Sequence, residues 1–167
     1  SNAFKLLYSG NIGAKQDWVF FIEFLNQLKV IDNVEVIVVG EGAEKDNLLP
    51  KIKDYNFVKH YNLVPYDELP SLLFGADLHI LFQKTDVIDT VMPSKILGMM
   101  ASAKPSIVTG NLKSEVATVF KDSNGGFYFD GKSMEDIINQ IILLKENKKI
   151  CLELGRNAKS YVQEKYA

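Results

Sequence analysis

The sequence predicts an α/β fold, a doubly wound parallel sheet of about six strands flanked by helices. Short apolar runs alternate with amphipathic stretches along the chain, which is the pattern of parallel strands joined by helical crossovers. Several runs end in glycine or polar residues, so each predicted strand leads into a loop. The composition agrees, because 47% hydrophobic and 24% charged side chains over 167 residues suit one domain with an ordinary buried core.

The expected strands are short apolar runs, most of them rich in β-branched residues. The clearest is Val34–Val39, which Gly40 stops. In chain order the expected strands cover residues 5–9, 34–39, 57–60, 78–82, 106–109 and 127–129.

The expected helices show apolar residues at helical spacing. Asp17 can cap the first helix, which is expected to end near Asp32 and Asn33. Pro93 suits the first helical position of another helix, which runs through Ala101. The others are expected at residues 43–55, 67–74, 134–147 and 155–165.

Parallel strands place their carboxyl ends at one edge of the sheet, and ligands of such folds bind in a crevice there. The loops at residues 10–15, 40–42, 60–67 and 83–95 are therefore expected to share the binding edge.

Charge, length and cysteine content exclude several classes of protein. With 19 basic and 21 acidic residues the net charge is −2, so no global basic field favours nucleic acid. The longest apolar runs are far shorter than the roughly 18 to 20 residues of a transmembrane span. The single Cys151 makes neither an internal disulfide nor a metal site and fits a reducing compartment.

The first residues, Ser1, Asn2 and Ala3, contain no initiator methionine and are interpreted as the remnant of an expression tag. Residues 4–167 are then expected to form a single domain taken from a longer protein.

The tetrapeptide Met92-Pro93-Ser94-Lys95 is the strongest candidate for an anion site. Proline at a helix start leaves the next backbone N–H groups unpaired, and the helix dipole favours an anion there. Ser94 adds a hydroxyl donor and Lys95 a positive charge, which together suit a diphosphate. An ordinary helix start with a solvated lysine is the alternative.

The loop after the first strand is the second candidate. Gly10 and Gly13 would let the backbone approach a phosphate closely, and Lys15 lies where a loop cation could reach it. A tight turn without a ligand is the alternative.

Other nucleotide and signalling motifs are absent from the sequence. Lys45 stands where the dinucleotide fingerprint that would begin at Gly40 needs its third glycine, and there is no P-loop. The strands ending at Ser9, Gly40 and Gln83 lack the acidic cluster of a phospho-acceptor domain.

The remaining isolated polar residues indicate less about function. His79 lies inside a strand and is expected to be a core histidine, whereas the role of His60 stays open. Neither has partners at metal-ligand spacing. Asp86 and Asp89 are either solvated loop carboxylates or contacts to ligand hydroxyls.

Taken in order, the motifs resemble the C-terminal, donor-binding domain of GT-B glycosyltransferases, specifically glycosyltransferase family 4, the glycosyl transferases of group 1. The Pro-Ser-Lys variant resembles a branch used in cell-surface polysaccharide assembly. The resemblance covers nearly the whole chain and rests on the runs YSGNIGAKQ (8–16), VVGEG (38–42), VPYDELP (64–70), ADLHI (76–80), MASAKP (100–105) and GRNAK (155–159).

The resemblance implies one Rossmann-like half of a GT-B fold and a site for a nucleoside diphosphate sugar, with uracil preferred. Lys15 and Lys95 would stabilise the leaving diphosphate, without a cofactor or a protein-bound metal. Further candidates for substrate binding come from the resemblance or from their place at the binding edge. They are Gly10, Asn11, Gly13, Leu63, Val64, Pro65, Tyr66, Asp86, Asp89, Thr90, Pro93 and Ser94.

The paired glutamates of the family, which contact the donor sugar and the ribose, correspond here to Thr90 and Gly98. Asp86 or Asp89 is the candidate to replace the first carboxylate. This departure keeps a second class open, a non-catalytic nucleotide- or protein-binding module. A small-molecule kinase or reductase is a third class, which the motifs disfavour.

The family implies that the complete enzyme transfers a hexose-type sugar to a surface polysaccharide or a lipid-linked acceptor. Its acceptor site would lie in an N-terminal domain, so the isolated chain is expected to bind nucleotide without turnover. The expected location is the cytoplasm, with the full-length protein at the inner face of the cytoplasmic membrane.

Overall fold

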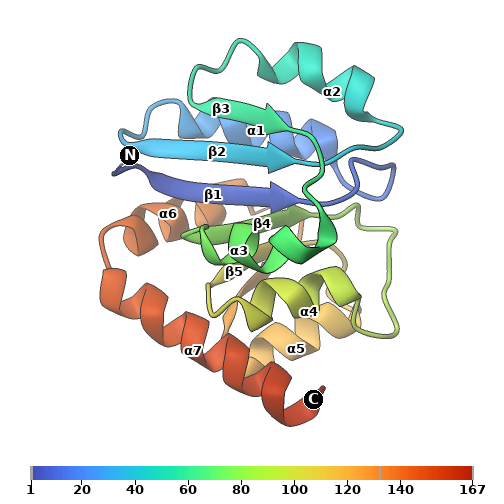
Figure 1. Ribbon diagram of the computed structural model, residues 1–167, viewed down its shortest axis with the longest axis vertical. Coiled ribbons are helices and arrows are strands. Elements are labelled where there is room, and N and C mark those ends of the chain that lie inside the picture. The colour runs from blue at the N-terminus through green and yellow to red at the C-terminus, as the bar shows by residue number, and fades with distance from the viewer. Residues whose placement is uncertain (1, 132, 167) are drawn as a thin grey trace.

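A six-stranded parallel sheet with helices on both faces forms the described part of the chain, residues 2–131 and 133–166 of a computed structural model (Figure 1). All strand pairs run in parallel, and the spatial order is β3-β2-β1-β4-β5-β6. This confirms the predicted fold class. The strands are β1 (Phe4–Ser9), β2 (Val34–Val39), β3 (Val58–Tyr61), β4 (Leu78–Phe82), β5 (Ser106–Thr109) and β6 (Gly126–Phe129).

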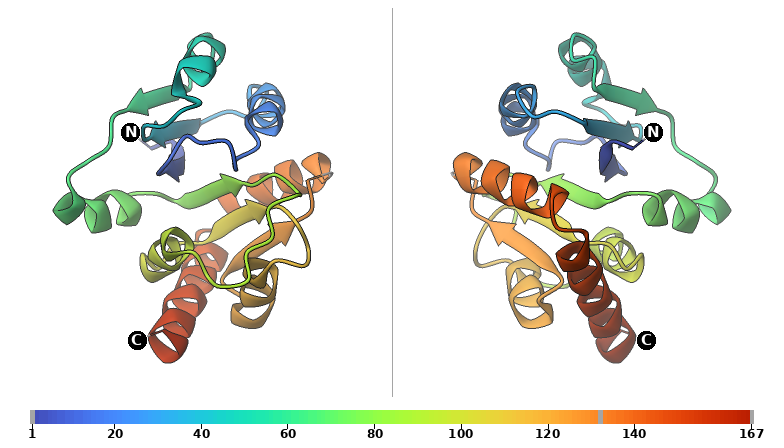
Figure 2. Two further views of the ribbon diagram at one scale, coloured as in Figure 1. Left: turned by 90° about the vertical axis from the view of Figure 1, so that its right-hand side faces the viewer. Right: turned by 90° about the vertical axis from the view of Figure 1, so that its left-hand side faces the viewer.

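The helices form two layers. Figure 2 shows α1 and α6 on one side of the sheet and α3 and α4 on the other. The helices are α1 (Trp18–Leu28), α2 (Lys45–Ile52), the 3-10 helix η1 (Tyr66–Glu68), α3 (Leu69–Phe74), α4 (Ser94–Ala101), α5 (Glu115–Ser123), α6 (Met134–Lys145) and α7 (Lys148–Lys165).

Alternation along the strands builds a core on each face of the sheet. Leu6 and Tyr8 belong to the large cluster that includes the buried phenylalanines of α1, whereas Leu7 belongs to a smaller cluster with Leu73 of α3. Successive strand residues point to opposite faces, so one apolar strand serves both layers.

The chain reverses its winding direction between β1 and β4, which are direct neighbours in the sheet. Their carboxyl ends lead into the loops that begin at Gly10 and Gln83, and α4 starts at the same edge (Figure 1). Such a switch point leaves a crevice between diverging loops.

One helix was not predicted, and the bounds of others differ from the sequence-based expectation. Helix α5 was not predicted, although the Ser114 hydroxyl accepts from Val116 N and Asn124 ends the helix in the left-handed conformation (φ 51°). Helix α1 ends at Leu28, before Asp32. Helix α7 begins at Lys148, so Gly155 lies inside the helix.

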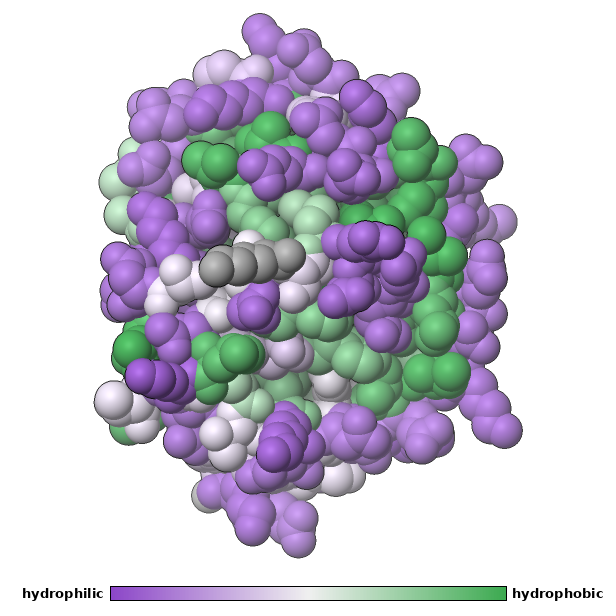
Figure 3. Space-filling view, turned by 180° about the vertical axis from the view of Figure 1, so that it is seen from behind, coloured by the Kyte–Doolittle hydropathy of each residue, from purple (hydrophilic) through white to green (hydrophobic). Residues whose placement is uncertain are grey.

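The outer surface opposite α3 and α4 is largely hydrophilic. Seen from behind, apolar residues gather along one side of the molecule (Figure 3). Ile142 and Leu143 of α6 and Leu152 of α7 are among the exposed apolar residues of the chain, and none of the three lines the groove described below.

Gly155 allows α7 to cross the end of α4 at backbone contact. A Cβ at this position would lie 1.9 Å from the carbonyl oxygen of Ala103. We expect Gly155→Ala to lower the free energy of unfolding by about 2 kcal/mol, despite the better helix propensity of alanine, because α7 must shift away. Urea denaturation measures the change.

Gly75→Ala is the matched control, because the nearest atoms to its Cβ would be carbonyl oxygens at 3.4 and 3.5 Å. We expect it to change stability by less than about 1 kcal/mol. Equal effects of the two substitutions would contradict the contact between α7 and the Ala103 carbonyl.

Candidate functional site

A groove of about 970 Å³ runs between α3 and α4. Its head lies at the carboxyl end of β1, where Ser9 and Gly10 meet Ser94 and Lys95. Its far end reaches Lys159 of α7. The groove therefore begins at the switch point, where this class of fold binds ligands.

Lys95 lies at the head of the groove, in the first turn of α4. Its ammonium is 4.0 Å from the centroid of the Tyr8 ring. A Cβ on Gly10, whose φ is +136°, would lie 2.6 Å from the Lys95 Nζ atom. Glycine at this position thus serves both the turn and the close approach of the cation.

Burial lowers the pKa of Lys95 from its ordinary value of 10.5 to about 7. The Tyr8 ring faces the ammonium of the half-buried Lys95 and is a weaker partner for the charge than water or an anion would be. Burial also raises the pKa of Tyr8, so its hydroxyl stays protonated and donates to the Asn11 carbonyl. An anion at the head of the groove would restore the full charge of Lys95.

Helix α4 presents its N-terminus to the same point. Pro93 was expected to be the first helical residue, but it is the N-cap, and the helix begins at Ser94. The Pro93 carbonyl accepts from the amides of Ile96 and Leu97. The amides of Ser94 and Lys95 lie in the first turn, before the first amides that donate to the Pro93 carbonyl. First-turn amides and the helix dipole favour an anion.

The loop after β1 is held by side chains and by the neighbouring turn. The Gly13 amide donates to Gln16 Oε1 at 3.0 Å, and Trp18 Nε1 donates to the Gly13 carbonyl at 2.9 Å. The Ile12 amide donates to the Glu41 carbonyl at 2.8 Å. The expected Gly13 contact to phosphate would therefore have to replace the bond to Gln16.

Lys15 lies exposed in the same loop, and its carbonyl accepts from the Lys84 amide at 2.9 Å. The structure thus joins the loops after β1 and β4. The lining of the groove includes Gly10 of the first loop but not Asn11, Gly13 or Lys15.

The segment after β3 forms one wall of the groove. Leu63, Val64 and Tyr66 line it, and Pro65 between them is the N-cap of η1. The Tyr66 side chain is 89% exposed. These side chains offer the apolar surface that a planar base can cover.

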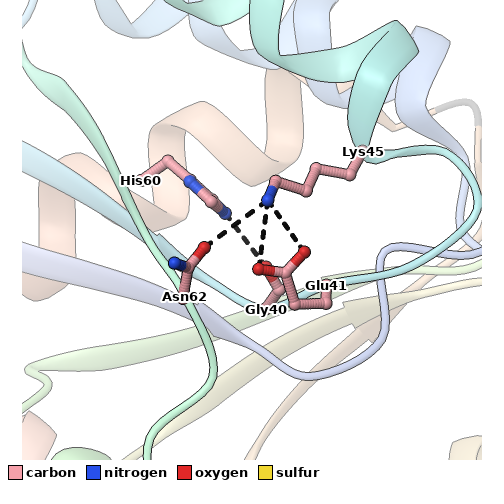
Figure 4. Close-up of polar contacts among 5 residues, drawn as sticks. All are labelled: Gly40, Glu41, Lys45, His60 and Asn62. Carbon is pink, nitrogen blue, oxygen red and sulfur yellow. Dashed lines mark hydrogen bonds and ion pairs between the residues drawn. The ribbon is translucent and has the colours of Figure 1, made fainter.

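Polar contacts fix this segment to the turn after β2 (Figure 4). Lys45 pairs with Glu41 at 2.8 Å and reaches Asn62 Oδ1 at 3.5 Å. His60 Nε2 lies 2.9 Å from the Gly40 carbonyl. The open question about His60 is thus answered by a backbone contact that ties β3 to the end of β2.

The loop after β4 lies outside the lining of the groove, and so do its predicted residues Asp86, Asp89, Thr90 and Pro93. Asp86 and Thr90 are exposed. Asp89 turns inward: its Oδ2 atom is buried without a hydrogen-bond partner, and its carbonyl accepts from the Glu115 amide at 2.8 Å. Asp86 is therefore the more accessible of the two carboxylates.

His79 and Ser102 connect the two walls of the groove at its far end, a link that the sequence reasoning missed. His79 is buried, and its Nε2 atom lies 2.9 Å from the Ser102 hydroxyl, which lines the groove. Burial lowers the pKa of His79 to about 4, and a backbone bond to Leu73 opposes this shift. His79 is thus a neutral, hydrogen-bonded core histidine, as expected.

The described residues hold neither a cluster of metal ligands nor a helix that could span a membrane. Within residues 2–131 and 133–166, no three His, Cys, Asp or Glu side chains are grouped so that they could hold a metal ion. In the same part of the chain no helix is long and apolar enough to cross a bilayer.

The chain matches the family described as "Glycosyl transferases group 1" over residues 1–161. It is 29% identical over 154 residues, 89% of this chain, to WcaI of Escherichia coli (strain K12), which is named as a colanic acid biosynthesis glycosyl transferase. The chain spans 38% of the length of WcaI.

Solved structures share the fold. The C-terminal domain of the group 1 glycosyl transferase LpcC from Francisella tularensis has a TM-score of 0.76 at 21% identity, with 98% of this chain and 86% of that one covered. Anabaena Alr3699/HepE, solved with UDP-glucose, has a TM-score of 0.78 at 18% identity, with 97% and 44% covered.

The pKa of Lys95 predicts how stability depends on pH. Between pH 7 and 10 the unfolded chain holds a proton on this residue that the folded chain has lost, so stability rises with pH. We expect urea denaturation to show a gain of about 1 to 2 kcal/mol from pH 7 to pH 9. Lys95→Met should remove this gain and be more stable than the parent chain at pH 6.

Lys53→Met removes an exposed lysine at the end of α2 and should keep the pH dependence of the parent chain. If Lys95→Met keeps it as well, the ammonium at the head of the groove is not desolvated.

Proposed function

Because the chain belongs to the group 1 glycosyl transferases, we propose that its groove binds the nucleoside diphosphate of a sugar donor, with UDP as the nucleotide. The observation that carries the proposal is the half-buried Lys95 at the head of the groove, beside the first-turn amides of α4. The similar fold of HepE, solved with UDP-glucose, supports the choice of nucleotide.

In this proposal Lys95 and the amides of Ser94 and Lys95 hold the diphosphate. During transfer the bond between the anomeric carbon and the diphosphate oxygen breaks, the acceptor oxygen forms the new bond to that carbon, and the proton of the acceptor hydroxyl passes to the departing diphosphate. Negative charge develops on the departing diphosphate, and fixed positive groups stabilise it. Lys15, in the loop after β1, is the second cation proposed for this edge.

The base would lie against Leu63, Val64 and Tyr66. The exposed ring of Tyr66 and the half-exposed Leu63 lose water contact when a base covers them, which favours binding. The network of Glu41, Lys45 and Asn62 holds this wall in place before the ligand arrives.

We propose further that the complete protein transfers a hexose-type sugar to a surface polysaccharide or lipid-linked acceptor at the inner face of the cytoplasmic membrane. The similarity to WcaI supports this role. Acceptor recognition is assigned to the part of such relatives that this chain does not span, so the isolated chain binds donor without turnover.

A non-catalytic nucleotide-binding module is the second candidate. Thr90 and Gly98 favour it, because neither supplies a carboxylate to the donor site. Released nucleotide from the full-length protein, incubated with UDP-sugar and acceptor, decides between the two: turnover supports the transferase, and tight binding without turnover supports the module.

Calorimetric titration with UDP, without and with magnesium, tests the site. We expect binding that does not require the metal, and Lys95→Met should weaken it about tenfold or more because a charge-assisted contact to the diphosphate is lost. Lys15→Ala should act in the same direction. Lys53→Met is the control and should bind as the parent chain does. Unchanged affinity in both lysine variants, with folding intact, would contradict the diphosphate site.

Proton uptake gives a second test. At pH 8 most of the Lys95 side chain is neutral, and a bound diphosphate should raise its pKa again. Titrations in buffers of different ionisation enthalpy should then show uptake approaching one proton per UDP, relative to Lys95→Met. Equal uptake by both proteins would show that Lys95 does not face the ligand charge.

A further inference from the structure

One face of α4 forms a wall of the groove. The residues that line it are Ser94, Lys95, Gly98, Ala101 and Ser102, which recur at helical spacing. Gly98 stands one turn after Ser94 on this face, about 6 Å further along the helix axis. Along this wall the lining residues therefore follow one another from Ser94 and Lys95 at the head of the groove to Ser102 at the far end.

In a nucleoside diphosphate the ribose lies between the diphosphate and the base. This order can be compared with the order of the residues along the groove. With the diphosphate at Ser94 and Lys95 and the base against Leu63 and Val64, the ribose lies beside Gly98. This placement rests on the proposed function, because it takes the head of the groove as the diphosphate site.

The wall beside Gly98 carries no carboxylate. The described lining of the groove includes the hydroxyls of four serines and the ammonium groups of Lys95 and Lys159, but neither Asp nor Glu. Ser102, the C-cap of α4, donates its proton to the Met99 carbonyl at 2.5 Å and contacts His79. A carboxylate is the usual acceptor by which nucleotide sites bind the hydroxyls of ribose.

We infer that this site does not select ribose over 2′-deoxyribose, so that it accepts deoxyribonucleoside diphosphates together with ribonucleoside diphosphates. A site that makes a strong hydrogen bond to a hydroxyl rejects the analogue that lacks it, because a buried polar group is left unpaired. Beside Gly98 the described lining offers the 2′-hydroxyl no carboxylate that its absence would leave unpaired.

Gly98 also leaves room for a side chain. A Cβ there would meet only Leu73 Cδ1, at 3.5 Å, which is ordinary contact. Glutamate at this position would extend into the groove where the ribose is expected. The inference can therefore be tested in two ways, by measuring the selectivity of the parent chain and by introducing a carboxylate at position 98 that should create selectivity for ribose.

Calorimetric titration of the 167-residue chain with UDP and with 2′-deoxy-UDP measures the selectivity directly. We expect the two dissociation constants to agree within about fivefold. A preference for UDP of more than about fivefold would overturn the inference while leaving the proposed function intact. Failure of both nucleotides to bind would overturn the proposed function and the inference with it.

Gly98→Glu tests the position of the ribose. Its carboxylate should create a preference for UDP over 2′-deoxy-UDP of about tenfold or more, since a hydrogen bond to a charged group is added for one ligand alone. The ratio is the readout, because repulsion between glutamate and the diphosphate weakens both ligands alike.

Gly98→Gln is the matched control for size. It fills the same space without the charge and should give a smaller preference than Gly98→Glu. If Gly98→Glu folds, binds both nucleotides and shows no preference, the ribose does not lie beside α4 at this turn, and the argument from Gly98 to the lack of selectivity is overturned. Circular dichroism of each variant checks its fold.

Discussion

The contact of the Lys95 ammonium with Tyr8 and Gly10 is the interaction on which the carboxyl edge of the sheet depends. It joins β1 to α4, elements that lie on opposite sides of the point where the winding direction reverses. The cation is held where its charge is poorly solvated, which is costly for the empty chain and favourable for a ligand that brings the opposite charge. The position of Lys95 thus lowers the free energy of unfolding of the free chain and favours the binding of an anion.

Around this contact the backbone is held in place before any ligand binds. The Ile12 amide donates to the Glu41 carbonyl, and the Ile12 carbonyl accepts from the Glu44 amide. The loop after β1 and the turn after β2 therefore form one unit, to which Lys45 and Asn62 connect the wall of the groove. Loops that are already ordered lose less entropy on binding.

The strands were predicted to within a residue or so at each end, because their apolar, β-branched runs are bounded by turn residues. Helix α5 was missed although Ser114 and Asn124 are ordinary boundary signals, and Gly155 was taken as a helix start because its contact with Ala103 is a property of the packed chain. At the site, Ser94, Lys95 and the segment at Leu63 line the groove, and their contacts with a ligand stay a prediction. Local sequence carries no sign that Gln16 engages the Gly13 amide or that Asp89 turns inward.

Helix α7 braces α4 through the close approach of Gly155 to Ala103, and it contributes Lys159 to the far end of the groove. During translation α7 leaves the ribosome after all six strands of the described sheet have been made. The nascent chain therefore completes its sheet before one wall of the groove has its support.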